Sequence, residues 1–412
     1  MPTESKLNTD LSSAFDVVIV GGGLVGACLA IALEKLPLRV AMLEAQGGGA
    51  MPAVFDQRNL SFNEATLNAL THLGVLPMLS RPSGDIASIE TSRVGDFGRV
   101  WLRAADYGRS YFGQVVVASD FGEALEKRLA LVPNLTRLRP AKFVSSTLDG
   151  DSRVVVYSDA SGAEHSLTCS LLVGADGAVS SVRSSLGIPS ESFDYGHSLF
   201  VCRLQMRKPP AGIAYERLSA EGPIAVLPRG DGHFGLVLGV ASDDVARVRG
   251  MSDAEYVAYA QDRFGYRAGE FVSVGERSVY PGMRVVASSV VADRAVLVGN
   301  AAQSLHPVGA QGFNLGLRDA MTLAELIEDG ESSLGSAVML SSYVSRRSAD
   351  RDRTMQMSHS MATIGTAQDI ASRVMREIAM VGAGRVKSVQ ARLVGGSMGY
   401  AGDVPRYCRS AS

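Results

Sequence analysis

Several features that mark particular classes of protein are scarce in this sequence of 412 residues. It has only four cysteines, which are far apart and form no C-x-x-C pair, so neither a disulfide framework nor a metal site is predicted. A reducing, cytoplasmic setting is expected. Acidic and basic residues nearly balance, 42 against 40, which argues against a nucleic-acid partner. Residues 1–14 lack the apolar core of a signal peptide and are predicted to be a disordered lead-in.

Glycine, in contrast, is abundant, with 44 residues, which indicates many tight turns or close approaches of the backbone. The uncharged run Val17–Leu33 is close to the length of a membrane-spanning helix, but it opens with four β-branched residues and then contains four glycines. That pattern predicts a buried strand over 15–20, a tight turn and a helix over 24–36. With a second strand over 38–44, it completes a β-α-β unit.

The turn of this unit reads Gly21-x-Gly23-x-x-Gly26. In a dinucleotide-binding turn, the first glycine makes the turn, the second lets a diphosphate approach the backbone, and the third lets helix and strand pack closely. The helix N-terminus adds free N–H groups and a positive dipole end. Glu44, at the end of the second strand, is placed to accept the ribose hydroxyls. This motif alone does not separate FAD from NAD.

Two further turns follow buried strands. The first contains Asp176 in Gly-Ala-Asp-Gly, which on its own is typical of an ordinary turn. The second, Val296–Asp319, carries Asn300, Pro307 and Gly312 before an amphipathic helix predicted over 313–329. Its helix start suits an isoalloxazine ring that gains negative charge on reduction. Two nucleotide-type turns far apart in the chain fit one long cofactor, which favours FAD.

The sequence pattern changes near residue 195, where short stretches of alternating apolar and polar residues, separated by turns, predict an antiparallel sheet. We therefore predict a discontinuous nucleotide-binding domain over 15–190 and 290–335, a substrate-binding sheet over 191–289, and a helical region over 336–412. Four apolar residues of the inserted sheet are predicted to line the substrate site: Ile224, Val226, Leu227 and Leu236. The alternative is that they form the ordinary core of a β-domain.

Together the three motifs resemble those of FAD-dependent aromatic hydroxylases of the para-hydroxybenzoate hydroxylase superfamily. The segment from Gly299 to Asp319 resembles the ubiquinone-biosynthesis hydroxylases, and the segment from Tyr215 to Pro228 resembles their 2-polyprenyl-6-methoxyphenol hydroxylase branch in particular. The resemblance covers roughly residues 15–326 and implies an α/β fold. In it, a Rossmann-like FAD-binding domain is interrupted by an antiparallel β-sheet domain and followed by a helical segment.

The resemblance also implies roles for individual residues. It assigns the diphosphate and ribose to Gly21, Gly23, Gly26 and Glu44. It assigns the rest of the cofactor path to Arg58, Asp176, Asn300, Pro307, Gly312 and Asn314, with Asp176 serving both FAD and NAD(P)H. One departure is local, because the usual order Ala-Gly before Gln311 is here Gly309-Ala310.

The implied reaction is hydroxylation of a polyprenylated phenol. NAD(P)H would reduce FAD, O2 would add to give a flavin 4a-hydroperoxide, and its distal oxygen would attack the electron-rich ring. A base that removes the phenol proton would help, and His306 is the candidate because it is the only imidazole inside a motif. The alternative for His306 is a loop histidine held by backbone hydrogen bonds. A prenylated substrate would need an apolar tunnel.

Other interpretations remain at this stage. A basic amphipathic pattern near Arg385 and Val389 predicts peripheral membrane contact, whereas packing on the FAD domain or a partner subunit is the simpler explanation. Other proteins of ubiquinone biosynthesis are candidate partners. An NAD dehydrogenase would not need the third motif, and a flavin halogenase would need two tryptophans where the chain has only Trp101. An FAD hydroxylase of another aromatic substrate, or a flavoprotein assembly component without turnover, is the alternative function.

Overall fold

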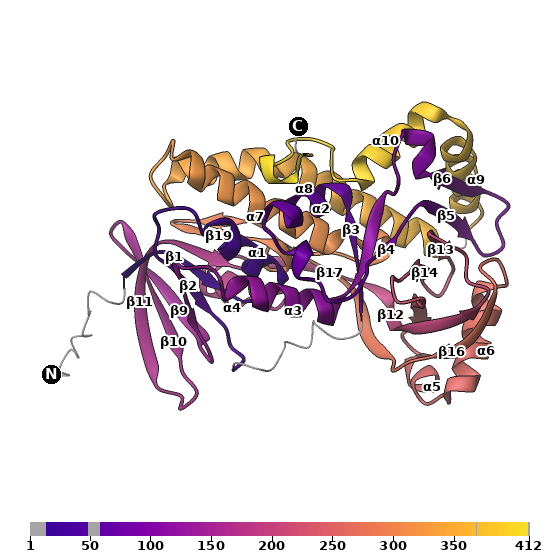
Figure 1. The fold of residues 1–412 in the computed structure, drawn as a ribbon, viewed down its shortest axis with the longest axis horizontal. Helices are drawn as coiled ribbons and strands as arrows, with labels where there is room; N and C mark the ends of the chain where they lie inside the picture. The colour runs from indigo at the N-terminus through magenta and orange to yellow at the C-terminus, as the bar shows by residue number, and fades with distance from the viewer. Residues whose placement is uncertain (1–13, 48–57, 368, 411–412) are drawn as a thin grey trace.

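The structure, a computed structural model, describes residues 14–47, 58–367 and 369–410. An eight-stranded sheet lies at the left of the view in Figure 1 and a nine-stranded sheet at the right, with C-terminal helices running along one side of the molecule. The predicted lead-in, residues 1–14, lies outside the described residues except for Ala14. The α/β fold with a sheet insertion and a helical C-terminal segment is confirmed.

The eight-stranded sheet is built on a parallel core in the order β19-β11-β1-β2-β8. These strands are β1 (Ala14–Val20), β2 (Val40–Leu43), β8 (Leu135–Leu138), β11 (Glu164–Gly174) and β19 (Ala295–Leu297). The antiparallel strands at its edges are β9 (Lys142–Asp149), β10 (Ser152–Ser158) and β18 (Val291–Ala292). Residues 17–20 and all of β2 are buried, as expected for parallel strands covered on both faces.

Five helices accompany this sheet: α1 (Leu24–Ala32), α2 (Glu64–His72), α3 (Ala118–Leu129), α4 (Ser181–Ser185) and α7 (Gln311–Asp329). Helix α1 packs against α7 and α3, so the helices that follow the first and third motifs are in contact. Helix α1 ends at Ala32, earlier than the predicted Leu36. The reason is that residues 33–36 close into a tight turn before Pro37, with the Leu36 N–H donating to the Leu33 carbonyl at 3.1 Å.

The nine-stranded sheet has the order β20-β17-β12-β15-β14-β13-β5-β6, with β16 paired to β12. Its strands are β5 (Ser88–Arg93), β6 (Arg99–Arg103), β12 (Ser190–Arg207), β13 (Ile213–Leu218), β14 (Ile224–Pro228), β15 (Phe234–Ala241), β16 (Glu270–Val274), β17 (Ser278–Ala287) and β20 (Gln303–Ser304). All pairings are antiparallel except β13 with β5.

This sheet corrects one predicted boundary. Residues 88–103 fall in the predicted nucleotide-binding segment 15–190, yet β5 and β6 extend the inserted sheet. Strand β13 pairs with β5 over a long sequence separation, through register pairs such as Glu216 with Thr91. Tertiary contacts determine such a parallel pairing, and no local sequence pattern predicts it. A small sheet of β3 (Asn59–Asn63), β7 (Gly113–Val117) and β4 (Gly84–Asp85) joins the two parts.

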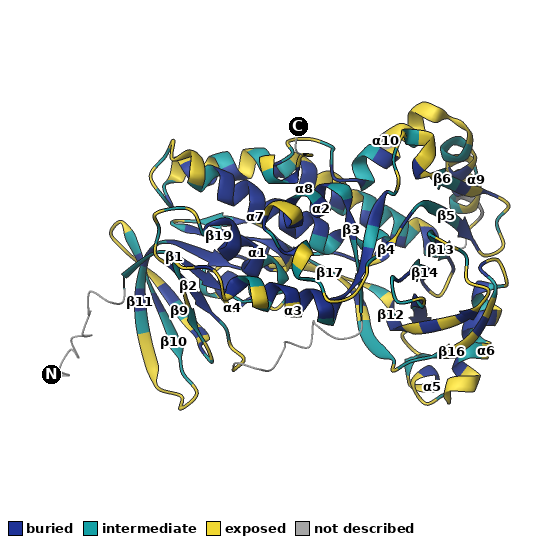
Figure 2. Cartoon of the chain, viewed as in Figure 1, coloured by how far each residue is buried: buried dark blue, intermediate teal, exposed yellow. Residues whose placement is uncertain are grey.

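Two hydrophobic cores correspond to the two large sheets. The first fills the space around the parallel sheet and its helices. The second lies between the nine-stranded sheet and α6 (Asp253–Phe264), with α5 (Val245–Arg249) beside it. Figure 2 shows buried positions continuing through the sheets and along α7. One face of the nine-stranded sheet therefore packs in its own core, and the other face is available for a different contact.

The C-terminal helices join these parts. They are α8 (Ala337–Thr366), α9 (Ile370–Arg385) and α10 (Lys387–Ser397). Helix α8 packs on α7 and on the 3-10 turn Val308–Ala310, whereas α9 packs on β6. The packing of α8 on α7 includes a buried ion network, in which Arg318 and Arg347 bind Asp319 and Asp350. Both sheets are thus held by the same helical layer.

Candidate functional site

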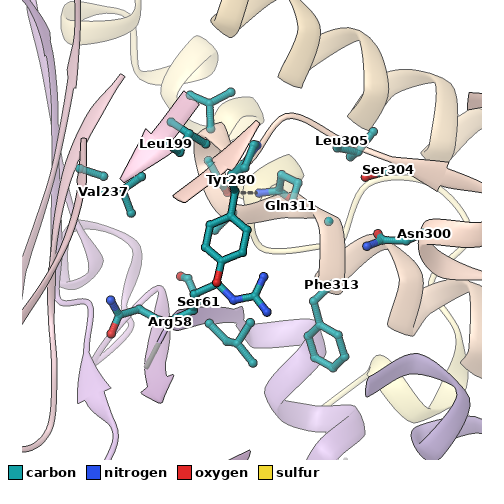
Figure 3. A pocket seen from close by; sticks show the side chains of 18 of the residues that line it. Arg58, Ser61, Leu199, Val237, Tyr280, Asn300, Ser304, Leu305, Gln311 and Phe313 are labelled. Carbon is teal, nitrogen blue, oxygen red and sulfur yellow. Dashed lines mark hydrogen bonds between the residues drawn. The ribbon is translucent and has the colours of Figure 1, made fainter. Parts of the chain in front are cut away.

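A cavity of about 1480 Å³ lies between the carboxyl ends of the parallel strands and the free face of the nine-stranded sheet. Figure 3 shows Leu199 and Val237 of that sheet on one side of it, and Asn300 and Phe313 of the third motif on the other. Eight of the ten residues predicted to bind the cofactor line the cavity: Gly21, Gly23, Glu44, Arg58, Asp176, Asn300, Pro307 and Gly312. The structure thus brings together three motifs that are far apart in the sequence.

The glycines of the first turn differ in what surrounds them. A Cβ on Gly26 would lie 2.0 Å from the Gly21 carbonyl oxygen, so Gly26 serves close packing and does not line the cavity. A Cβ on Gly23 would meet nothing within 4 Å. Gly23 is the N-cap of α1, and no side chain caps this helix. The N–H groups at this helix start are therefore available to an anion such as a diphosphate, which the open space at Gly23 would admit.

Glu44 lies just beyond β2 and lines the same end of the cavity. Its two carboxylate oxygens accept hydrogen bonds from Arg137, at 2.7 Å and 3.0 Å. Arg137 also binds Glu126 at 2.7 Å, and its hydrogen bond lowers the pKa of the Glu126 carboxyl. The bidentate contact fixes the Glu44 carboxylate while each oxygen keeps a lone pair for a ribose hydroxyl. Sequence reasoning missed Arg137, because an arginine in a short strand carries no local signal of its partner.

Asp176 holds the second turn in shape. Its carboxylate accepts hydrogen bonds from the Ser180 hydroxyl at 2.5 Å and from the Val182 N–H at 3.0 Å, so it fixes the start of α4. The buried Arg183 donates to the Ala301 carbonyl at 2.9 Å, which ties this turn to the third motif. These contacts explain why Asp and Arg occur together in the second motif: they fix the turn beside the cavity.

Asn314, predicted to line the flavin ring, is 2% exposed and does not line the cavity. Its side-chain oxygen accepts from the Asn63 N–H at 3.1 Å, and its amide donates to the carbonyls of Ser61 and Ala310 at 2.9 Å and 2.8 Å. Asn314 thus clamps β3 and the preceding turn against the start of α7. Its side-chain amide is therefore engaged inside the protein, and its assignment to the flavin ring stays a prediction.

The local departure at Gly309-Ala310 has a structural consequence. Both residues have left-handed backbone angles, with φ of +70° at Gly309 and +51° at Ala310. An alanine there costs about 1–2 kcal/mol relative to an ordinary conformation. The hydrogen bond from Asn314 to the Ala310 carbonyl supports this conformation. The loop beside the cavity is therefore strained at Ala310, where the resemblance described above implies glycine.

His306 does not have the environment of a catalytic base. It is fully buried and does not line the cavity. Its Nδ1 accepts from the Val308 N–H at 3.1 Å, so the proton lies on Nε2, which faces His197 Nε2 at 2.8 Å. His197 Nδ1 lies 3.1 Å from the Tyr195 carbonyl, to which it donates. Burial and His197 lower the pKa of His306 to about 3. The prediction of a base is corrected: both nitrogens are engaged in a neutral chain of hydrogen bonds.

The inserted sheet contributes the apolar part of the cavity, but the face that lines the cavity is the opposite of the predicted one for most residues. Of the four predicted lining residues only Leu227 lines it, whereas Ile224, Val226 and Leu236 lie in the second core against α6. The cavity face of the sheet is made by the alternate residues: Leu199, Val201, Ala225, Leu227 and Val237. The prediction is corrected for the three core residues because both faces of this sheet carry apolar side chains, so apolar alternation does not tell which one meets a ligand.

Two further features of the lining escaped sequence reasoning: the partner of Arg58, which is Tyr280, and the residue Glu216. The Arg58 guanidinium lies over the Tyr280 ring, 4.4 Å from its centroid, at the middle of the cavity (Figure 3). Glu216 of β13 also lines the cavity, and burial raises the pKa of its carboxyl to about 7 although the Gly309 N–H opposes this shift. A glutamate inside an otherwise apolar strand face was a usable signal, because such a residue rarely lies inward without a purpose.

The chemistry of this cavity fits FAD. One end offers an uncapped helix start with open space at Gly23 and a fixed acid at Glu44. Farther along, a Cβ on Gly312 would also meet nothing within 4 Å, at the first turn of α7. Asn300 lies between these points and is exposed to the cavity. A dinucleotide needs this sequence of groups, with ribose and diphosphate at one end and a second helix start at the other.

Comparison with known proteins agrees with this geometry. A ubiquinone hydroxylase named UbiL, from Rhodospirillum rubrum, is 32% identical over 341 residues, covering 81% of this chain and 78% of that protein. A 3-demethoxyubiquinol 3-hydroxylase from Escherichia coli is 27% identical over 384 residues, covering 90% of this chain and 95% of that protein. The crystal structure of p-nitrophenol 4-monooxygenase PnpA from Pseudomonas putida shares the fold, with a TM-score of 0.75 at 21% identity over 93% of this chain and 97% of that one.

The family described as FAD binding domain matches residues 14–358, which span both parallel-sheet segments and the inserted sheet. This match includes every residue that lines the cavity from the three motifs. The prediction of FAD, made from the first and third motifs, is confirmed. The chain belongs to the FAD binding domain family, and FAD is its cofactor.

Proposed function

We propose that this protein is an FAD-dependent monooxygenase that hydroxylates the ring of a polyprenylated phenol in ubiquinone biosynthesis, using NAD(P)H and O2. The observation that carries the proposal is the continuity of one cavity, which begins at the glycine turn of α1 and ends on an apolar sheet face. Relatives named ubiquinone hydroxylases match most of the chain. An apolar face suits a prenylated ring better than a carboxylate-bearing one.

Bound FAD supplies the activated oxygen, with electrons from NAD(P)H. The chain contributes binding, orientation and exclusion of water. The turn at Gly23 and the carboxylate of Glu44 would hold the nucleotide half, and the start of α7 at Gly312 would face the ring system. The five apolar side chains of the sheet face would hold the substrate and keep water away from the reacting atoms.

The proposal is tested with purified protein loaded with FAD. We expect NAD(P)H oxidation and O2 uptake that a short-chain prenylphenol stimulates, with a hydroxylated product found by mass spectrometry. In cells, gene deletion should cause the matching quinone precursor to accumulate. If the substrate stimulates neither NAD(P)H oxidation nor O2 uptake while FAD is bound, the chain is a flavoprotein component without turnover. Stimulation by other phenols alone would indicate a different aromatic substrate.

We also propose peripheral membrane contact through α9 and α10. Among the described residues, no helix is both long and apolar enough to cross a bilayer. However, seven exposed apolar residues form what we call the α9–α10 apolar surface: Val374, Met375, Ile378, Val381, Val386, Val389 and Leu393. The exposed Arg385 and Lys387 lie among them in the sequence. Leu393, Met380 and Ala383 also line the cavity, so a lipid-borne substrate would have a short path inward.

Liposome flotation tests this contact. The double variant Met375→Ser/Ile378→Ser should lose association with vesicles containing anionic lipid, because two side chains that are 68% and 67% exposed no longer enter the interface. Val338→Ser on α8, which is 65% exposed outside this surface, is the matched control. Equal flotation of all variants, or none by the natural protein, would contradict the proposal.

A further inference from the structure

The reaction class proposed above needs a group that removes the phenol proton, and His306 does not supply it. The geometry points to the carboxylate of Glu216 as the group that accepts the proton of the substrate's ring hydroxyl. This inference rests on the proposed function. It names a residue for a step that neither the FAD motifs nor the apolar lining performs.

The position of Glu216 in the sheet is the first argument. Glu216 pairs with Ala225 on β14 and with Thr91 on β5, and both of these neighbours line the cavity. Its side chain therefore stands on the face that holds Leu227 and Val237. Among the described residues, it is the one charged side chain that the nine-stranded sheet contributes to the cavity lining. A carboxylate in an apolar lining is costly unless it meets a polar group of a ligand.

The second argument is the contact with the loop at the cofactor end. The Gly309 N–H lies near enough to the Glu216 carboxylate to oppose the rise of its pKa, and Gly309 lies in the turn between Pro307 and Gly312. Glu216 is thus placed where the substrate face meets the turn that precedes α7. A phenol held on the sheet with its ring toward that turn would present its hydroxyl to this carboxylate.

The third argument is that four of the other charged lining residues are engaged elsewhere. Asp176 fixes the start of α4, and Glu44 is held by Arg137 at the nucleotide end. Arg376 binds Asp96 at 2.7 Å. The Arg58 guanidinium is stacked on Tyr280. Among the described residues, no lysine, arginine or histidine lies within ion-pairing distance of the Glu216 carboxylate, which leaves its oxygens for a hydroxyl.

The charges around Glu216 suit a base that works near neutral pH. Its register partners, Thr91 and Ala225, do not titrate, and neither do Val308–Ala310 of the facing turn. The nearest charges along the strands are Glu90 and Arg217, of which Glu90 binds Arg267 at 3.0 Å. With no cation beside it, burial raises the pKa of the Glu216 carboxyl to about 7. A carboxylate with this pKa takes a phenol proton far more readily than one near its ordinary value.

The proton transfer balances without an added reactant. The phenol O–H bond breaks, its electron pair stays on the ring oxygen, and the proton forms a bond to a Glu216 oxygen. The extra electron density at the ring carbons favours attack on the activated oxygen that bound FAD supplies. When the attacked ring carbon loses its own proton and aromaticity returns, the ring oxygen takes back the proton from Glu216.

The experiment compares the natural protein, Glu216→Gln, Glu216→Asp and the control Glu221→Gln, an exposed carboxylate on the turn after β13. Each is loaded with FAD, and 2-geranylphenol is the probe. The first readout is the pH dependence of kcat with this probe. In the natural protein and in Glu221→Gln, kcat should rise as pH passes about 7, where the Glu216 carboxyl loses its proton. In Glu216→Gln this rise should be absent.

The second readout is turnover. We expect kcat to fall about 10²- to 10⁴-fold in Glu216→Gln, the usual contribution of a positioned base, with KM changed much less. The rise of kcat with pH near 7 should disappear, and Glu216→Asp should restore part of it. A more acidic phenol, 4-nitrophenol, should show a smaller loss between the natural protein and Glu216→Gln because it ionises without help.

The outcomes separate the two proposals. If the natural protein does not hydroxylate any prenylphenol, the proposed function fails. If it does, and Glu216→Gln keeps the same rate and pH profile, only the inference about Glu216 is overturned. Should Glu216→Gln fail to load FAD, the pH profile of the natural protein decides, because a kcat that does not rise near pH 7 contradicts a carboxylate base.

Discussion

Replacing Arg347 by methionine should destabilise the protein strongly, because the residue belongs to a buried quartet of charges. Arg318 and Arg347 carry two positive charges, and Asp319 and Asp350 carry two negative ones. Arg347 contacts Asp319 at 2.9 Å and Asp350 at 2.9 Å, and the side chains of Arg347 and Asp319 are completely inaccessible to solvent. Methionine has a similar length, so the change removes the charge while leaving most of the packing.

The expected cost is about 3–5 kcal/mol, the typical loss when one member of a buried ion pair is removed. Without Arg347 the quartet has a net charge of −1 in a site that water does not reach. The matched control is Arg353→Met, because Arg353 binds the same Asp350 carboxylate at 3.1 Å but is 43% exposed. An exposed pair contributes about 0–1 kcal/mol. The two substitutions, at arginines on the same helix that bind the same carboxylate, should therefore differ several-fold in their effect on the free energy of unfolding.

Denaturant unfolding followed by circular dichroism gives the free energies, and flavin fluorescence reports release of FAD. Release should come earlier in Arg347→Met, because Asp319 also accepts hydrogen bonds from the Gly299 N–H at 3.3 Å and from Gln303 at 2.6 Å. Adding Asp319→Asn to Arg347→Met restores a neutral cluster and should recover stability. The charge argument is refuted if the two arginine variants differ by less than about 1 kcal/mol, or if Asp319→Asn adds a further loss.

Three further predictions concern the cofactor end. Burial lowers the pKa of His306 to about 3, below its value in the unfolded chain. The contribution of neutral His306 to the free energy of unfolding should therefore be complete above about pH 6.5 and should fall as pH drops below that value. Measured by denaturant unfolding at several pH values, this fall should be shallower in His306→Gln, and an equal slope would contradict the assignment of a neutral His306. Gly23→Ala should fold normally but purify with little FAD, since its methyl group would fill the open space at this position, whereas Gly26→Ala should yield less folded protein. Flavin absorbance per folded chain distinguishes the two variants. Full FAD content in Gly23→Ala would exclude a diphosphate at this position. Ala310→Gly should raise the melting temperature of the holoprotein, as it removes about 1 kcal/mol of backbone strain, and a lower melting temperature would show that Ala310 is not strained.

The sequence was sufficient for the local units of the fold. The β-branched run before Gly21, the glycine spacing and the charged end at Glu44 all belong to one β-α-β unit of neighbouring residues, so the pattern alone fixes their arrangement. The same holds for α7, which the structure begins at Gln311, close to the predicted start. These predictions succeed because their contacts are close in sequence and follow from strand and helix periodicity.

Contacts between distant segments could not be predicted in this way. Nothing in residues 88–103 indicates that they pair with β13, and nothing near Arg137 indicates that it clamps Glu44. His306 shows the same limit: its motif suggested a catalytic base, but its contacts with distant residues make it a buried, neutral histidine. The Val308 N–H occupies Nδ1, whose lone pair a base would need, and His197, more than a hundred residues earlier in the chain, accepts the proton of Nε2.

The phase of the inserted sheet shows why the substrate side was harder to predict than the cofactor side. Along β14 and β15, the residues at even positions, such as Ile224 and Leu236, are as apolar as Leu227 and Val237 at odd positions. Helix α6 covers one face and the cavity lies under the other, and both faces carry apolar side chains, so hydrophobicity cannot separate them. A charge can, because a buried carboxylate is tolerated only where a ligand or polar group meets it. On β13 that residue is Glu216, and its face is the one that holds Leu227 and Val237.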